Sequence, residues 1–271
     1  MPPNTLNDRH YLEKEYKDSA NVEARINLHQ RFSVNKVGWH PWVFDHFDLP
    51  PLSRILELGC GPGHLWRDNL SRIPAGWNIT LSDFSAGMLE ATRRNLEKQR
   101  PFEFKVIDAQ SIPFENEYFD AVIANHMLYH IPDRLAALAE IRRVLKPASH
   151  FYASTVGDRH MIEIINLLRK FDPALSTWGR VADSFTLENG MAQLSPLFTN
   201  IELYRYEDAL VVTEVNPLVE YILSGWAQIP LGRKTEQFRQ FVASEFESQG
   251  SIFHITKDSG LFVSVLMESE K

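Results

Sequence analysis

The sequence contains a single cysteine, Cys60, among its 271 residues. One thiol rules out an internal disulfide and fits a reducing compartment. Apolar runs of membrane-spanning length are also missing, and the start of the chain, Met1–Thr5, shows no basic region followed by an apolar core. These absences predict a soluble, cytoplasmic protein with no membrane partner.

An excess of basic residues is missing as well. The chain has 28 Lys and Arg against 35 Asp and Glu, a formal net charge of -7. Proteins that bind nucleic acids usually present a basic face, so this balance disfavours DNA or RNA as a substrate without excluding a local basic patch. The 44% of hydrophobic and 23% of charged residues are ordinary for a globular protein. Such a length suits one large domain with an elaboration, or one domain with a small cap.

The most informative stretch that is present covers residues 55–63, Ile-Leu-Glu-Leu-Gly-Cys-Gly-Pro-Gly. A short apolar run ends in glycines at alternate positions, Gly59, Gly61 and Gly63. This pattern indicates a buried parallel strand that turns sharply into a helix, with a ligand against the turn. A dinucleotide fingerprint starting at Gly59 would need glycine where His64 stands, so the spacing disfavours a nicotinamide cofactor.

At this loop the chain resembles the class I S-adenosylmethionine-dependent methyltransferases, in their small-molecule, methyltransferase type 11 branch. Three further segments follow in the order of that family: strands ending in acids at 79–83 and 104–109, and a fourth strand at 119–126. The resemblance spans roughly residues 40–157. It implies an α/β fold with a doubly wound, mostly parallel seven-stranded sheet, and S-adenosylmethionine as cofactor.

The rest of the chain agrees with alternating strands and helices. Similar proteins usually have glycines after the Lys-Pro pair, where this chain has Ala148 and Ser149. We predict helices at 86–99, 134–145, 161–171, 187–198, 216–226 and 236–248, and strands at 150–156, 200–212, 251–256 and 261–267. The resulting division is an N-terminal helical lid (1–50), a cofactor-binding core (51–157), and cap helices with the last strands of the same sheet (158–271).

The N-terminal region is strongly aromatic at Trp39–Phe44. In the family, such an extension often folds over the cofactor and part of the substrate. The other interpretation is that these rings only pack the N-terminal helices onto the core. The sequence leaves both open.

The resemblance also implies a cofactor site. Asp83 would bind the ribose hydroxyls, although an acid at a helix N-terminus is an alternative. Asp108 would hold the adenine with the Ala109 amide, unless it only forms an Asx turn. Glu57 would lie near the amino group of the cofactor, and Cys60 would fill a small buried position rather than act as a nucleophile. The full predicted set is Glu57, Gly59, Cys60, Gly61, Gly63, Asp83, Phe84, Met88, Asp108, Ala109, Gln110, Asn125 and His126.

Two candidate catalytic residues, His126 and His130, follow the fourth strand. Either could be structural, or could touch the acceptor as a general base. They stand four residues apart, as in a H-E-x-x-H zinc site, but Met127 replaces the glutamate, so we expect no metal. The segment Asn125–Leu128 also differs from the Asn-Pro-Pro-Tyr type of similar enzymes that methylate DNA adenine or protein glutamine.

The sequence therefore predicts an enzyme that moves a methyl group from S-adenosylmethionine to a small organic acceptor by direct in-line displacement, as a monomer or homodimer. The alternative is a non-catalytic sensor or scaffold that retains the fold and the cofactor.

Overall fold

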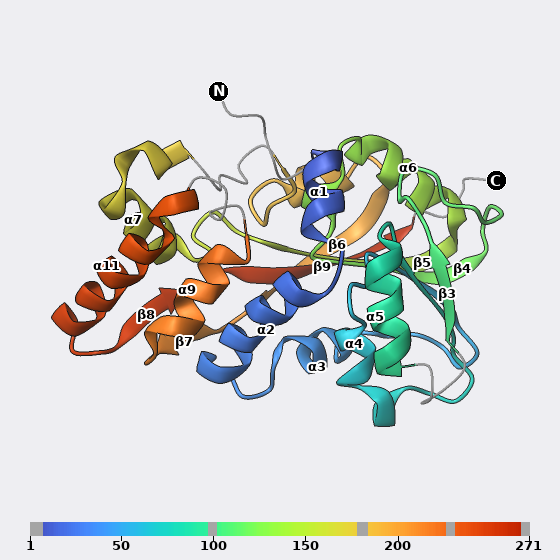
Figure 1. Cartoon of the computed structure of the whole chain (residues 1–271). Helices are drawn as coiled ribbons and strands as arrows, with labels where there is room; N and C mark the ends of the chain where they lie inside the picture. The colour runs from blue at the N-terminus through green and yellow to red at the C-terminus, as the bar shows by residue number, and fades with distance from the viewer. Residues whose placement is uncertain (1–7, 97–101, 178–183, 226–230, 267–271) are drawn as a thin grey trace.

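The computed structural model describes residues 8–96, 102–177, 184–225 and 231–266. At its centre is a seven-stranded sheet of order β3-β2-β1-β4-β5-β9-β6, in which β9 alone runs antiparallel to its two neighbours (Figure 1). Its strands are β1 (Arg54–Leu58), β2 (Asn78–Asp83), β3 (Glu103–Val106), β4 (Phe119–Asn125), β5 (Leu145–Val156), β6 (Phe198–Tyr206) and β9 (Ser259–Leu266). The predicted α/β fold with a doubly wound, mostly parallel sheet is confirmed.

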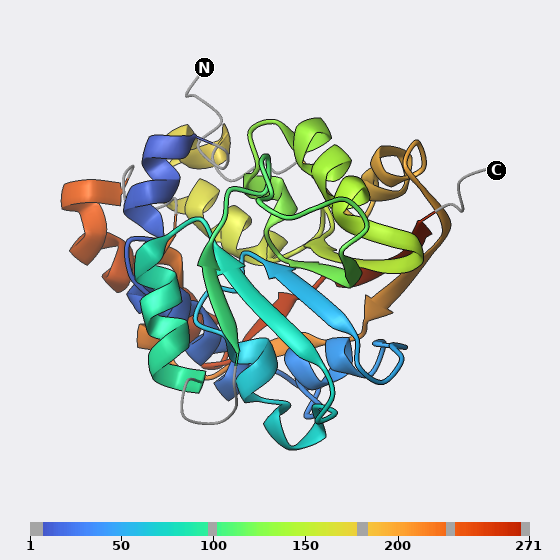
Figure 2. The ribbon, with the colours of Figure 1, turned by 90° about the vertical axis from the view of Figure 1, so that its right-hand side faces the viewer.

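Alternate residues of the central strands enter different hydrophobic clusters, as the period of two in a strand requires. On one face, Ile55 packs with residues of α3 (Trp39–Phe44), α4 (His64–Arg67) and α5 (Ala86–Leu96). Leu56 points the other way, toward α6 (Arg134–Val144) and α8 (Gly190–Leu194). Figure 2 shows the sheet between these two helical layers. Burial on both faces explains why the strands are nearly continuous apolar runs.

A third hydrophobic cluster lies beside the sheet. It joins helix α2 to the C-terminal half of the chain, and α2 lies against α9 (Figure 1). A two-stranded antiparallel sheet, β7 with β8, belongs to the same group. Its elements are α2 (Ala20–Phe32), α7 (Ile162–Phe171), β7 (Ala209–Val212), α9 (Val215–Leu223), α11 (Thr235–Ser248) and β8 (Phe253–Thr256), and the short α1 (Arg9–Glu15) precedes them.

Two predicted elements of the C-terminal half are wrong. The helix expected at 187–198 is reduced to α8, because Pro196 lacks the N–H that would continue it, and Phe198 already begins β6. The strand expected at 200–212 is two strands in different sheets. Between them, the Asp208 carboxylate accepts hydrogen bonds from Ser33 and from the Asn35 N–H, which turns the chain out of the first sheet.

Other boundaries differ by a few residues. The third strand ends at Val106, and β5 begins at Leu145 rather than at residue 150. The register of β5 on β4 shifts in this early part, and Ala148 has a φ of 60°, the left-handed conformation that glycine adopts easily. The predicted ends of three elements, at 97–99, 226 and 267, lie outside the described residues. Within the described ranges, no helix is both long and apolar enough to cross a membrane.

Candidate functional site

A cavity of about 650 Å³ opens at the carboxyl ends of β1, β2 and β4. This is the edge at which strand order reverses, between β1 and β4, and where open α/β sheets bind ligands. Its volume lies in the range of small-molecule sites. Every residue of the predicted cofactor set except Gly63 lines it, together with His130.

The three loop glycines have different roles. All three have positive φ, but a Cβ on Gly61 would meet nothing within 4 Å and would project into open space. A Cβ on Gly63 would instead lie 2.7 Å from Thr92 and 2.8 Å from Leu96 of α5. Gly63 therefore does not line the cavity, contrary to the prediction. It allows α4 to begin close against α5, while Gly61 leaves the cavity room for a ligand.

Glu57 is a carboxyl group at 1% exposure near the end of β1. Its Oε2 accepts a hydrogen bond of 2.6 Å from the indole Nε1 of Trp66. Burial raises the pKa of Glu57 to about 8, and the single indole hydrogen bond offsets only part of that shift. A buried carboxyl group held this way fits an ammonium ligand, whose charge would favour the ionised form.

Asp83 ends β2 and is 5% exposed. One carboxylate oxygen accepts the Gly61 N–H at 3.0 Å and the other accepts the Ser85 N–H at 2.9 Å. Burial nevertheless raises the pKa of Asp83 to about 6. The carboxylate is thus fixed beside the glycine loop, and each oxygen retains a lone pair for a hydroxyl donor.

Asp108 lies in the turn after β3 and forms the Asx turn that the sequence left as an alternative. Its Oδ1 accepts from the Gln110 backbone N–H at 3.0 Å and from the Gln110 side chain at 2.9 Å. The turn and ligand binding are compatible, because Asp108, Ala109 and Gln110 all line the cavity.

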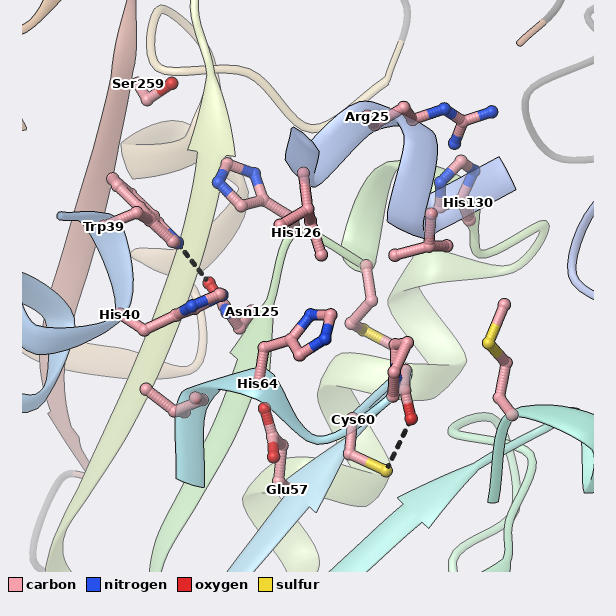
Figure 3. Close-up of a pocket in the computed structure, with 18 of the residues that line it drawn as sticks. Arg25, Trp39, His40, Glu57, Cys60, His64, Asn125, His126, His130 and Ser259 are labelled. Carbon is pink, nitrogen blue, oxygen red and sulfur yellow. Dashed lines mark hydrogen bonds between the residues drawn. The ribbon is translucent and has the colours of Figure 1, made fainter. Parts of the chain in front are cut away.

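The end of β4 is tied to the N-terminal region. Asn125 Oδ1 accepts from Trp39 Nε1 at 3.2 Å and from Ser154 Oγ at 2.6 Å (Figure 3). The Trp39 ring also lies 4.8 Å from the ring of His126, between centroids. His126 has a φ of 53°, a conformation that costs energy for a residue with a Cβ and is often found at functional sites. Burial lowers the pKa of His126 to about 3, so its imidazole is neutral.

His130 contacts a residue that the sequence did not single out. Its Nε2 lies 2.8 Å from the hydroxyl of Tyr16, and the two rings meet edge to face. Burial raises the pKa of Tyr16, so the phenol keeps its proton. The backbone carbonyl of Tyr16 accepts a hydrogen bond of 2.6 Å from Ser85 Oγ, which fixes this part of the N-terminal region over the loop after β2.

The N-terminal aromatic segment contacts both the cavity and the core. Trp39 lines the cavity, whereas Val43 and Phe44 are buried in the core beneath it. Its function as a movable lid, like the three-part division of the chain, stays a prediction.

Several cavity residues come from segments far from the glycine loop, and sequence reasoning missed them. Arg25 of α2 forms an ion pair with Glu15 and donates to the carbonyl of Ser224. Others with polar groups include Tyr16, His29, His160, Lys257 and Ser259. No spacing in the sequence links these positions, because long-range folding brings them together.

The single cysteine, Cys60, is buried and is a free thiol. Burial raises the pKa of the Cys60 thiol well above its usual value, which agrees with the expected packing role. Among the described residues, no three His, Cys, Asp or Glu side chains are grouped to hold a metal ion.

Comparison with known proteins gives a consistent family. Residues 56–153 match the model of a methyltransferase domain. Demethylmenaquinone methyltransferase from Staphylococcus haemolyticus is 34% identical over 133 residues, 49% of this chain and 55% of that protein. The Staphylococcus aureus (strain JH9) protein of the same name is 31% identical over 149 residues, 54% of this chain and 60% of its own. The chain thus matches less than two thirds of the length of these relatives.

Solved structures share the fold. A putative methyltransferase from Bacillus halodurans has a TM-score of 0.57 at 13% identity, covering 84% of this chain and 99% of that one. Phosphoethanolamine N-methyltransferase 2 of Haemonchus contortus, solved with S-adenosyl-L-methionine, has a TM-score of 0.58 at 18% identity, covering 96% of this chain and 60% of that one. At such identities the likeness concerns the fold.

Proposed function

We propose that this chain, which belongs to the class I S-adenosylmethionine-dependent methyltransferases, binds S-adenosylmethionine and transfers its methyl group to a small organic acceptor. One observation carries the proposal. Three carboxyl groups, Glu57, Asp83 and Asp108, border a single cavity around a glycine loop whose Gly61 leaves space for a ligand.

The residues fit the cofactor part by part. Asp83 would accept hydrogen bonds from the ribose hydroxyls, because its carboxylate is held at the cavity by the Gly61 N–H on one oxygen and the Ser85 N–H on the other. Asp108 and Ala109 would hold the adenine, and Glu57 would lie near the ammonium group, whose positive charge would counter the raised pKa of Glu57 and favour its ionised form. Asn125 and His126 would contact the methionine part. When bound, the cofactor supplies an electrophilic methyl carbon on a sulfonium centre.

The residues of the chain would align the acceptor with the methyl group, exclude water and, where needed, take a proton from the acceptor. The wall made by Tyr16, Arg25 and Trp39 covers the cavity from the N-terminal side, which keeps the acceptor in line and solvent out. Where the acceptor must lose a proton, His130 would receive it at Nε2 through the hydroxyl of Tyr16, in the tautomer whose Nε2 carries no proton. An acceptor that is already deprotonated would need no base.

Calorimetric titration with S-adenosylmethionine, S-adenosylhomocysteine and NAD tests the binding step. We expect both sulfur compounds to bind and NAD not to bind. Turnover is then measured with a labelled methyl donor and a metabolite extract of the host. Tight cofactor binding without any labelled product would instead support the alternative of a sensor or scaffold, and no cofactor binding would overturn the proposal.

A further inference from the structure

The cavity has two chemically different ends. Its carboxyl groups Glu57, Asp83 and Asp108 surround the glycine loop. Basic residues from other parts of the chain also line it, among them Arg25 and His29 of α2, and His160 and Lys257, which follow β5 and β8. In Figure 3, Glu57 lies at the lower edge of the view and Arg25 at the upper edge. The proposed cofactor residues occupy the first end, so the second is left for the acceptor.

Lys257 supplies the permanent charge of this second end. Its side chain is 7% exposed, and its ammonium donates at 2.7 Å to Asp208, whose side chain is 0% exposed. Asp208 also accepts from Ser33 and from the Asn35 N–H, so its carboxylate is well satisfied. An ammonium group has three donors. Within the described residues, the structure gives Lys257 one hydrogen bond, so further donors are available to a ligand.

His160 adds a directed donor beside that charge. Its Nδ1 accepts the Asp258 backbone N–H at 3.2 Å, which assigns the ring proton to Nε2. Burial, followed by the charge of Lys257, lowers the pKa of His160 to about 3. The imidazole is therefore neutral, with one N–H to donate.

At this second end of the cavity, His29 carries a buried nitrogen, Nδ1, that lacks a hydrogen-bond partner among the described residues. Burial, then Lys257 and His160, lower the pKa of His29 well below its usual value, so this ring is also neutral. Leaving a buried polar atom unpaired is unfavourable, and such atoms usually have a partner. A ligand in the cavity that His29 lines would provide that partner.

We propose that the acceptor carries an oxyanion, a carboxylate or a phosphate, and that Lys257, His29 and His160 bind it. The proposal rests on the proposed function, because it assigns the other end of the cavity to the cofactor. A cationic acceptor fits less well. The aromatic face of Tyr206, which would suit a cation, already has the Lys257 ammonium 5.3 Å from its centroid, and a second positive charge would be repelled.

The test uses the full chain saturated with S-adenosylhomocysteine, and calorimetry with benzoate, phenylphosphonate and neutral benzamide as probes. Titration with S-adenosylhomocysteine comes first, so a failure of the proposed function is seen separately. We expect at least one anion to bind one-to-one and about tenfold more tightly than benzamide. The tighter of the two anions distinguishes a carboxylate from a phosphate.

Variants then assign the binding to the three residues. The double change Asp208→Asn with Lys257→Met removes both charges, so no carboxylate is left buried and unpaired. It should weaken anion binding about tenfold, as should His29→Phe, while the affinity for S-adenosylhomocysteine stays the same. The matched control is Lys170→Met, an exposed lysine that pairs with the Glu245 carboxylate outside the cavity, and it should have no effect.

Three results would overturn the proposal. They are benzamide binding as tightly as both anions, no binding of either anion to the protein with S-adenosylhomocysteine bound, and anion binding that His29→Phe and the double variant leave unchanged. A melting temperature for each variant confirms that the protein titrated is folded.

Discussion

The two ends of the cavity differ in how the chain builds them. The cofactor end consists of short loops that follow consecutive parallel strands, so its residues lie within 57–126 and in a fixed order. The acceptor end combines α2, the segments after β5 and β8, and Tyr221 of α9. The first end depends on local strand-to-helix turns, whereas the second exists only when distant segments have packed together. A cofactor-binding site can therefore be predicted from local sequence far more easily than an acceptor-binding site can.

The largest expected effect is a loss of methyl-transfer rate when a residue proposed to take the proton of the acceptor is replaced. If His130 is the base, His130→Ala should lower the rate by about 10²–10⁴-fold and leave cofactor affinity almost unchanged. Tyr16→Phe should reproduce part of the loss, since it removes the hydroxyl 2.8 Å from His130 Nε2. Rates and calorimetry on both variants measure this.

The exposed His254→Ala serves as the matched control for His130. A structural histidine would show a different pattern. The melting temperature would fall, but the folded variant would remain nearly as active, and His130 would then be excluded as the base.

At the cofactor end, Glu57→Gln should change how stability depends on pH. A carboxyl group with a folded pKa near 8 holds its proton more tightly when folded, so it costs stability as pH rises from its unfolded value of about 4.5 to about 8. Glutamine avoids this cost and can still accept from Trp66. Relative to wild type, the ligand-free variant should gain about 2–4 kcal/mol between pH 5 and pH 8. Denaturant unfolding at the two pH values checks this, and equal changes in both proteins would contradict it.

Asp83→Asn should reduce cofactor binding by a smaller amount. Replacing the charged acceptor weakens hydrogen bonds to the ribose by about 1.5–3 kcal/mol, roughly ten- to a hundred-fold in cofactor affinity at pH 8. Because the pKa of Asp83 is raised to about 6, the wild-type affinity should fall as the pH drops below that value, and the variant should show less of this fall. Unchanged calorimetric affinity would remove Asp83 from the site.

The smallest expected effect is a difference in stability and cofactor affinity between alanine substitutions at two glycines of the same loop. Gly61→Ala and Gly63→Ala both place a Cβ at positive φ, which costs about 1–2 kcal/mol. At Gly63 the Cβ also meets Thr92 and Leu96, so this variant should be the less stable of the two. At Gly61 the Cβ enters the cavity, so that variant should lose more cofactor affinity. Unfolding and titration of both give the comparison, and equal behaviour would mean that the loop is not divided in this way.

Much of the fold could be predicted because its signals are local. The apolar runs of β1, β2 and β4 and the glycine loop specify strands, turns and their order without reference to the rest of the chain. Where a predicted element was wrong, the cause was an interaction that a local sequence pattern does not include. The chain turns between β6 and β7 because Asp208 bonds to Ser33 and Asn35, which are remote in sequence.

The same distinction applies to the candidate site. Asp83 and Asp108 end or follow strands, so their place at the carboxyl edge of the sheet follows from periodicity. Gly63 was misplaced because a glycine can be required by a neighbouring helix as well as by a ligand. Lys257 and His160 carry no local signal, since each acquires its environment from the other and from α2.

The position of β9 has a consequence for how the protein folds while it is synthesised on the ribosome. β9 is inserted between β5 and β6, yet it begins at Ser259 while β5 ends at Val156. A nascent chain can thus form β1 to β5 long before the strand that must enter beside β5 has been synthesised. Contacts between residues so distant in sequence form slowly. Until β9 pairs with it, the edge of β5 is unpaired and can pair with strands of other chains. Lys257 and Ser259 arrive with the same segment, so a growing chain would complete its glycine loop well before the opposite end of the cavity, and would begin turnover only when the sheet closes.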